Sequence, residues 1–496
     1  MLELESPGLP KSPKVLAALL FLPSVLGIAV SRLVSNPYAV TYPGVISLAA
    51  AAFLLVGQTR DDGRDTSPTL PPRPALIAFF SIVSVITIVY AGSNFRRTDV
   101  VLLSVFGFYL IAITFFFSAK RPILKLCLLA VVGVFHRSLL YFSSTLYLGN
   151  DVFFHNRRAL EIAASGSLDP LRASKYFFTP VYHVLTALTS VLTGTTTRIT
   201  VFWGLSVLFT AGVVFAVYAL TSAVQSKRSA ELAAFLYITA DWVINWGIQP
   251  QPTSIGVLIF PLIMLSLVAY LRGNSKQWLT VLVLFLLTLA LTHQLSMYIV
   301  TIGLVSYLFF RYLYLKTQLE RSVTITILGG AVSLGVGLFS IVRGPESSSL
   351  SLLGAFLAGI FRTMSTYGAG LTSRNVFELP NTSFFVPGGV TTLSTVHVLG
   401  STILLGFAVF GALHWLRSES QTTRGAGYAL GGMAATLLLF ILVGPLVGLS
   451  NLLPFRWFAF LYVPLSILGG HGIWMVVRTV DWGVHFPPRY TVILVL

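Results

Sequence analysis

The stretch that decides the fold is residues 124–162, which read LKLCLLAVVGVFHRSLLYFSSTLYLGNDVFFHNRRALEI. An apolar run of helical length leads directly into a segment that carries an acid, a histidine and two arginines. A transmembrane helix needs about 20 mostly apolar residues, so residues 124–146 are predicted to span a membrane. The polar segment that follows is then predicted to lie at the membrane surface where this span ends.

The rest of the chain has the same apolar character. Its 496 residues are 55% hydrophobic and only 10% charged, whereas a soluble protein carries about 25% charged residues. This composition excludes a soluble enzyme. The single cysteine, Cys127, excludes a disulfide framework and any multi-cysteine metal site. The net charge of +16 is spread over short loops between apolar runs, which is typical of loops that face anionic lipid and does not indicate nucleic acid.

Apolar segments of spanning length recur along the whole chain. They predict an all-α integral membrane protein, a polytopic bundle of about 14 transmembrane helices. In chain order the predicted spans are residues 15–34, 38–57, 75–92, 99–118, 124–146, 199–224, 229–248, 253–271, 278–293, 296–315, 322–342, 396–416, 426–449 and 456–478.

Lysine and arginine in the short loops predict the orientation. With the N-terminus inside, most of these basic loops fall inside, provided that residues 178–194 do not cross the membrane. Two long segments, 147–198 and 343–395, then lie outside. The predicted division is an extra pair of spans with a linker (1–74), a further pair (75–123), a core (124–478) and a tail (479–496) that is either short or the start of an incomplete helix.

The first outer segment is predicted to hold two amphipathic helices at the membrane interface. In the first, Asp151, His155 and Arg158 share one face at spacings of four and three. Aromatic and aliphatic residues occupy another face of that helix; they are Phe153, Leu160 and Ala164. The second helix has an apolar stripe at spacings of four, three and four, made by Val181, Leu185, Leu188 and Leu192. A helix with one polar and one apolar face is typical of the interface plane.

Asp151 is the leading candidate for a catalytic base, because the chain has only sixteen acids and few of them fall on outer loops. The alternative is that it caps the helix that begins near Val152, and the two roles are compatible. His155, one turn later, could join it in binding a divalent cation, and oxygen ligands with an imidazole suit Mn²⁺ or Mg²⁺.

The other predicted site residues are polar groups at or near the outer ends of spans. They are His155, Lys175, Asp241, Gln251, His293 and Arg456. Asp241 lies inside a predicted span, where an ionisable group is costly and is either functional or structurally paired. Arg456 could bind phosphate oxygens or act as an interfacial anchor beside Trp457. His293 could bind a substrate hydroxyl or a phosphate, or be structural.

Taken together, these segments resemble the GT-C superfamily of membrane glycosyltransferases, which includes protein mannosyltransferases, oligosaccharyltransferases and aminoarabinose transferases. The resemblance is carried by the outer loop GNDVFFHNRRALEIAASGSLDP (149–170), the stretch KYFFTPVYHVLTALTSVLTG (175–194), the turns IQPQPTS (248–254) and LTHQLS (291–296), and the late PFRWFAF (454–460). It covers residues 124–478. It implies a polyprenyl-phosphate sugar donor, transfer on the outer face, and a catalytic or metal-binding role for the acid at Asp151.

The chain departs from the superfamily in two respects. Some four extra spans precede the loop, and the second acid that many members have near this loop is replaced in the turn by Gln251. The nearest alternatives for that acid are Glu161, Asp169 and Asp241.

The predicted function is therefore a membrane glycosyltransferase in a multi-pass cell-membrane protein, with its active site on the extracytoplasmic side. The predicted partners are a polyprenyl-phosphate sugar, membrane lipid, and a glycan, lipid or protein acceptor. Three alternatives stay open: a lipid-linked sugar flippase or transporter, a polysaccharide polymerase, and a non-catalytic binding or scaffold protein of the same fold. A transporter would show two similar halves and polar groups near the midplane.

Overall fold

A computed structural model describes residues 37–55, 122–144, 147–148, 150–273, 275–315, 392–444 and 454–479, with short stretches between 17 and 112 and between 327 and 361. These parts of the chain contain helices and no strand. The predicted spans 15–34, 75–92, 99–118 and 322–342 and the outer segment 343–395 lie largely outside the described residues, and the tail 479–496 almost wholly.

Six helices of the described chain are long and apolar enough to cross a membrane. In chain order they are Pro122–Phe142, Thr197–Ser222, Pro252–Gly273, Gln294–Leu315, Gln421–Leu442 and Phe458–Arg478. Five of them match a predicted span to within four residues, because apolar length is the strongest signal in such a sequence. Gln421–Leu442 overlaps the predicted span 426–449 but begins five residues earlier and ends seven residues earlier. The chain is thus a helical membrane protein, and the described residues do not establish the predicted total of about 14 spans.

The contacts between helices divide the chain into two compact units. The first contains α2 (Pro37–Leu55), most of α14 (Gln294–Leu315), α17 (Thr392–Leu416), α18 (Gln421–Leu442), η7 (Pro454–Trp457) and α19 (Phe458–Thr479). The second runs from α5 (Pro122–Phe142) to α13 (Lys276–Ala290) and includes the first residues of α14.

The first unit is organised around the contact of α17 with α19. Gly411 and Gly472 lie where the two helices cross, and a Cβ at either position would overlap a main-chain carbonyl of the other helix, Leu468 O or Phe407 O. Small residues allow such close approach of backbones, as is usual between helices in a membrane. His414 follows Gly411 by one turn of α17, and His471 directly precedes Gly472 on α19. His471 Nε2 lies 3.1 Å from His414 Nδ1.

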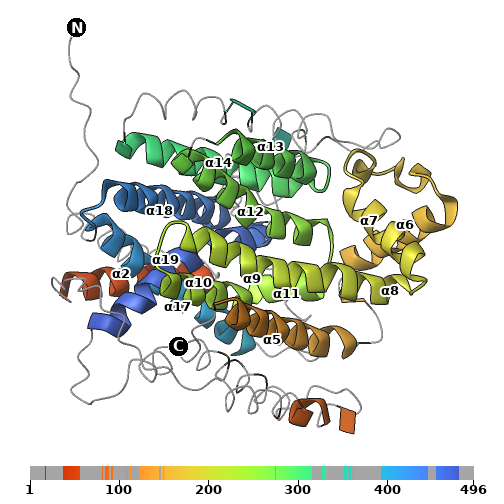
Figure 1. The fold of residues 1–496 in the computed structure, drawn as a ribbon, viewed down its shortest axis with the longest axis horizontal. Coiled ribbons are helices and arrows are strands. Elements are labelled where there is room, and N and C mark those ends of the chain that lie inside the picture. The colour runs from red at the N-terminus through yellow and green to blue at the C-terminus, as the bar shows by residue number, and fades with distance from the viewer. Residues whose placement is uncertain are drawn as a thin grey trace. The chain divides into compact units, whose positions relative to one another are not determined.

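The second unit packs α5 against α9 (Val207–Ser222), and α9 against α10 (Lys227–Thr239) and α12 (Pro252–Gly273), as Figure 1 shows. α9 continues from α8 (Thr197–Thr200) through a π-helical turn, Val201–Ser206. A buried ion pair of 2.8 Å between Lys125 Nζ and Glu231 Oε1 ties α5 to α10. Both charges are almost fully buried, so each needs the other as a partner.

The predicted span 229–248 is not one continuous helix. α10 ends at Thr239, Ala240 is extended with ψ of 135°, and α11 (Asp241–Ile248) begins immediately afterwards. Asp241 is therefore the first residue of a short helix and not the middle of a long one. Its Oδ1 accepts a hydrogen bond of 2.7 Å from the Trp242 main-chain N–H.

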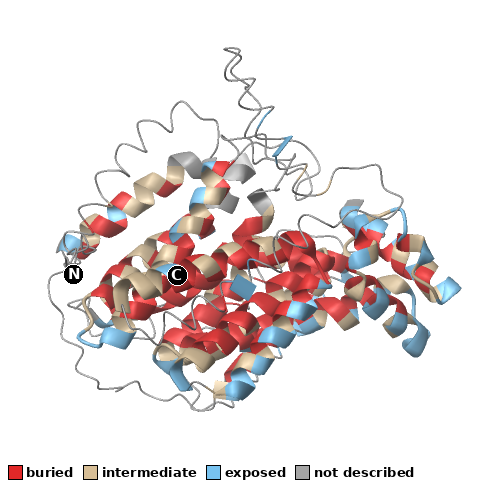
Figure 2. Cartoon of the chain, turned by 90° about the horizontal axis from the view of Figure 1, so that it is seen from above, coloured by how far each residue is buried: buried red, intermediate tan, exposed pale blue. Residues whose placement is uncertain are grey.

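Two further helices, α6 (Asn150–Ser165) and α7 (Val181–Thr193), lie side by side at one end of the second unit, next to α8 (Figure 1). Two single 3₁₀ turns, η1 (Asp169–Leu171) and η2 (Lys175–Phe178), connect them. Gly194, with φ of +64°, ends α7 in the left-handed conformation that glycine adopts without strain. Both helices lie within the segment 147–198, in which the sequence predicts two helices. Figure 2 shows exposed residues concentrated at this end and buried residues along the packed helices.

Candidate functional site

The α6–α7 pair has the opposite burial pattern to a pair of helices on a soluble protein. α7 buries polar residues, His183 and Thr186, together with Tyr182 and Ala187. The apolar residues of α7 are exposed instead: Val184, Leu185, Leu188, Val191 and Leu192. The exposed face thus includes three residues of the predicted apolar stripe. α6 likewise exposes Phe153 and Leu160.

Two buried histidines join α6 to α7. His155 Nδ1 lies 2.9 Å from His183 Nε2, and both side chains are almost completely buried. The ring of Tyr176, from η2, packs edge-on against His155 with 4.7 Å between ring centroids. Burial, helped by the positive charge of Arg158, lowers the pKa of His183 to about 4. His183 is therefore neutral at pH 7. His155 is buried, whereas Asp151, which the sequence places on the same polar face, is exposed.

Tyr182 connects this pair to the turn 248–254, which the sequence predicts to lie outside. Its hydroxyl donates to Pro250 O at 2.7 Å and lies 3.4 Å from Asn156 Oδ1. Burial raises the pKa of the Tyr182 phenol, so it stays a donor. The next residue of the turn, Gln251, is buried, and its main-chain N–H donates to Ser254 Oγ. The turn is thus held against α7 by the hydrogen bond from the Tyr182 hydroxyl to the main-chain oxygen of Pro250.

A second turn, 291–296, which the sequence also predicts to lie outside, holds the start of α7 and the η2 segment. Val181 N–H donates to Leu291 O at 3.2 Å, and Gln294 Nε2 donates to Lys175 O at 3.0 Å. His293 Nδ1 accepts from the Ser296 main-chain N–H at 3.3 Å and lies 2.7 Å from Ser296 Oγ. Because Nδ1 is the acceptor, the proton of the neutral ring is on Nε2.

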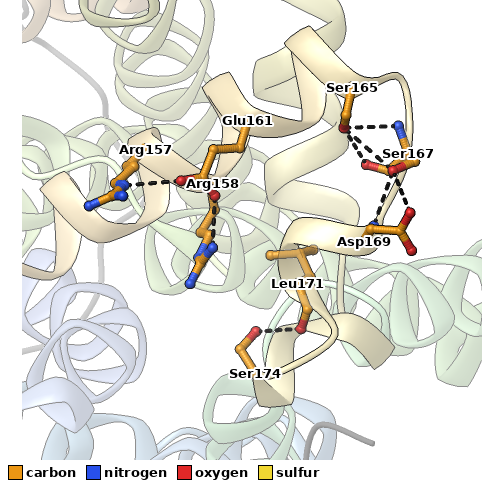
Figure 3. A network of polar contacts seen from close by, with 8 residues as sticks. All are labelled: Arg157, Arg158, Glu161, Ser165, Ser167, Asp169, Leu171 and Ser174. Atoms are coloured by element: carbon orange, nitrogen blue, oxygen red, sulfur yellow. Dashed lines mark hydrogen bonds and ion pairs between the residues drawn. The ribbon is translucent and has the colours of Figure 1, made fainter. Parts of the chain in front are cut away.

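Charged residues of the segment 147–198 form local contacts, and Figure 3 draws those of Glu161 with its two arginines and of Asp169 with Ser167. Arg157 and Arg158 both bind the carboxylate of Glu161, at 3.0 and 2.7 Å. Desolvation of Glu161 opposes these contacts, yet the two arginines hold the pKa of its carboxyl below the ordinary value. Asp169 accepts from Ser167 Oγ and pairs with Arg172. Glu161 and Asp169 are thus occupied by neighbouring side chains, which makes them poor candidates for a general base.

Asp151 is exposed and stands in the first turn of α6, which begins at Asn150. It therefore lies inside the helix and not before it, so the alternative interpretation as a cap of a helix starting near Val152 is wrong. A carboxylate in this first turn still stabilises the helix through its dipole. Asp151 is thus exposed at the surface one helical turn before the buried His155.

The structure brings some of the predicted site residues together. A continuous set of contacts links His155, the main chain of Lys175, the turn that contains Gln251 and the turn that contains His293. Asp241 lies at the far end of α11 from the Gln251 turn. Arg456 belongs to η7 in the first unit.

The sequence interpretation missed four residues that hold these elements together: Asn156, Tyr176, Tyr182 and His183. For His183 the signal is that it is a polar residue off the apolar stripe of its helix. In a helix that rests on lipid, that side faces inward.

The predicted pairing of Asp151 with His155 in a metal site does not fit this structure. One nitrogen of His155 is engaged by His183, and its side chain is buried while Asp151 is exposed. Within the described residues, no group of three or more histidine, cysteine, aspartate or glutamate side chains is placed to hold a metal ion.

The fold resembles solved structures, although no family model and no curated protein matches the sequence. An apo crystal structure of the oligosaccharyltransferase of Archaeoglobus fulgidus matches with a TM-score of 0.50 and 14% identity, over 76% of this chain and 54% of that chain. The chain therefore spans about half the length of that enzyme.

Two further structures from Archaeoglobus fulgidus give weaker matches. One is the oligosaccharyltransferase AglB in complex with an inhibitory peptide and a dolichol-phosphate, with a TM-score of 0.44 and 15% identity over 75% of this chain and 53% of that one. The other is an oligosaccharyltransferase complex with Zn and sulfate, with a TM-score of 0.46 and 14% identity over 73% and 52%. The match with the apo structure shows that the fold of this chain resembles that of an archaeal oligosaccharyltransferase.

Proposed function

We propose that this protein is a membrane glycosyltransferase that moves a sugar from a polyprenyl-phosphate-linked donor to an acceptor on the outer face of the membrane. Three features support the proposal. The fold resembles that of an archaeal oligosaccharyltransferase, an acid is exposed at the start of the outer helical pair, and two outer turns converge on that pair.

The observation that carries the proposal is the burial pattern of α7. Its exposed face is apolar along the whole helix, from Val184 to Leu192, while His183 and Thr186 point inward. In water such a face would be unfavourable, at about 25 cal/mol per Å² of apolar surface. At the membrane interface it would rest on acyl chains. A helix in that position holds the neighbouring Asp151 at the depth of a lipid headgroup, which is where a lipid-linked sugar phosphate lies.

The chemistry requires one base and stabilisation of one leaving group. The acceptor hydroxyl or amide attacks the anomeric carbon, and its proton passes to the carboxylate of Asp151. The bond between the anomeric carbon and the phosphate oxygen breaks, and the polyprenyl phosphate departs with the bonding electrons. General-base assistance of this kind contributes about 10²–10⁴-fold to the rate.

Two groups of the second unit are proposed to hold the phosphate. Lys175 is exposed in η2, and its ammonium lies 5.5 Å from the Tyr176 ring centroid. His293, when its ring is neutral, carries its proton on Nε2 and can donate it to a phosphate oxygen. Charge-assisted hydrogen bonds to the phosphate would stabilise the charge that develops on it in the transition state.

The test uses purified protein, radiolabelled polyprenyl-phosphate sugars and a panel of hydroxyl and amide acceptors. Asp151→Asn is expected to lower the rate of transfer by about 10²-fold or more, because asparagine cannot accept the proton. Asp169→Asn is the matched control, since it removes an exposed carboxylate of the same outer segment that is already occupied by Ser167 and Arg172. Full activity in Asp151→Asn, or no transfer from any donor, would overturn the proposal.

A further inference from the structure

An arginine on α5 is buried completely inside the second unit. Arg137 has no exposed surface. Its Nη1 donates to Gly133 O at 3.1 Å and its Nη2 donates to Ile238 O at 3.0 Å. Among the described residues, no carboxylate forms an ion pair with it. Burying an arginine without a counter-charge is costly, so its main-chain contacts need an explanation.

The contact with Ile238 lies at the break between α10 and α11. A helix that ends inside a membrane leaves its last carbonyls without partners, and no water is there to satisfy them. Here three of these carbonyls, on Leu236, Tyr237 and Ile238, have a donor. Thr239 Oγ1 bonds Phe235 O and Leu236 O, and Ala240 N–H donates to Tyr237 O. The guanidinium of Arg137 supplies the donor for Ile238 O, and its charge complements the negative end of the α10 dipole.

The side chain of Arg137 also fixes where α11 lies. A Cβ on Gly247, near the end of α11, would overlap Nε and Cδ of Arg137. On the other side of the same residue, Ser206 Oγ donates to Gly247 O. α11 is thus held between Arg137 and the π-helical turn that begins α9. Gln249 directly follows α11, and Pro250 comes next, so the place of α11 determines the place of the outer turn that Tyr182 binds.

We propose that Arg137 is a positioning residue: by capping α10 and packing against Gly247, it sets where the outer turn 248–254 stands beneath α7. That Arg137 sets the position of this turn does not depend on the reaction. Its relevance to sugar transfer rests on the proposed function. Arg137 itself touches no substrate, because it is fully buried. It acts through α11, Pro250 and Tyr182 on the helical pair that begins with Asp151.

The experiment measures how fast a thiol in the turn reacts in the purified full-length protein. In a Cys127→Ala background, Gln251→Cys reports on the buried turn, and Thr221→Cys reports on a buried position of α9 far along the same unit from the turn. Arg137→Met, which keeps the length of the side chain, is expected to raise the maleimide labelling rate of Gln251→Cys by about tenfold or more, as the loss of a charge-assisted hydrogen bond would. Labelling of Thr221→Cys is expected to change by less than about twofold.

A conservative variant separates a role of Arg137 in positioning the turn from a general loss of protein stability. Arg137→Lys retains a cation that can donate to Ile238 O, so it is expected to restore most of the protection of Gln251→Cys. Gly247→Ala, which displaces the guanidinium without removing it, serves as the second variant if Arg137→Met does not fold. Equal acceleration at both reporters, or no acceleration at Gln251→Cys, would overturn the inference. Since the labelling needs no sugar donor, its outcome does not depend on whether the protein is a transferase.

Discussion

The contact between His155 and His183 is the residue-scale feature that most constrains the outer helices. Each ring presents one nitrogen to the other in a buried space lined by Tyr176 and Tyr182. One ring must donate and the other must accept, so the contact cannot survive protonation of both rings. An added proton would place a positive charge in a buried site close to Arg158.

Acid is therefore expected to destabilise the protein through His183. Its pKa is near 6.5 in the unfolded chain and about 4 in the folded protein. Between these values the unfolded state binds the proton and the folded state does not, so stability falls as the pH falls from about 6.5 to 4, by up to about 3 kcal/mol. Thermal unfolding of the purified protein at pH 7.5 and pH 5 measures this change.

His183→Gln provides the comparison, because it removes the titrating group and keeps a hydrogen-bonding side chain. Its unfolding midpoint is expected to fall less between the two pH values than that of the parent. The same acid sensitivity in both proteins would show that other groups are responsible.

The candidate site was only partly predictable from the sequence. The acid at Asp151 and the turns around Gln251 and His293 were found because they are polar residues beside long apolar runs. Tyr182 and His183 were not selected, because a periodicity shows which residues share a face and not which face is buried. In lipid the apolar face is the outer one, so polar residues that would count as surface in water lie inside.

At the scale of elements, the break at Ala240 shows that the apolar pattern of a span does not reveal an interruption of its helix. No glycine or proline marks residues 239–241, so a continuous helix over 229–248 was the natural prediction. The break depends on donors supplied from elsewhere, chiefly Arg137 on α5, which local sequence cannot indicate. Spans without such a break were predicted well, since their apolar length alone requires a helix in lipid.

The crossing of α17 and α19 gives a second prediction at this scale. Gly411→Ala would place a Cβ on Leu468 O, a main-chain atom that cannot move aside independently. The substitution is expected to lower stability by about 1–3 kcal/mol, measured as a lower unfolding midpoint in detergent.

Gly431→Ala is the matched control, since a Cβ at this position on α18 meets nothing within 4 Å. It is expected to leave the midpoint unchanged or slightly raised, because alanine favours a helix over glycine. Equal stability of Gly411→Ala and Gly431→Ala would contradict the backbone contact between α17 and α19.

At the scale of the whole molecule, the proposed function depends on the side of the membrane that α6 and α7 face. The basic loops of the sequence predict that this pair is outside and that the loop before α10 is inside. In a Cys127→Ala background, a membrane-impermeant maleimide added to intact cells is expected to label Ser165→Cys, which is exposed at the end of α6. It is expected to label Lys227→Cys, exposed at the start of α10, only after permeabilisation. The reverse pattern would place Asp151 in the cytoplasm and remove the basis for transfer on the outer face.

The inverted burial of α7 has a practical consequence for how this protein can be handled. A fragment comprising residues 147–198, expressed alone in aqueous buffer, would expose the continuous apolar face of α7 to the solvent. It is expected to precipitate or self-associate. The outer pair therefore cannot be excised as a water-soluble catalytic fragment. Nanodiscs or bicelles would be required wherever its native arrangement matters.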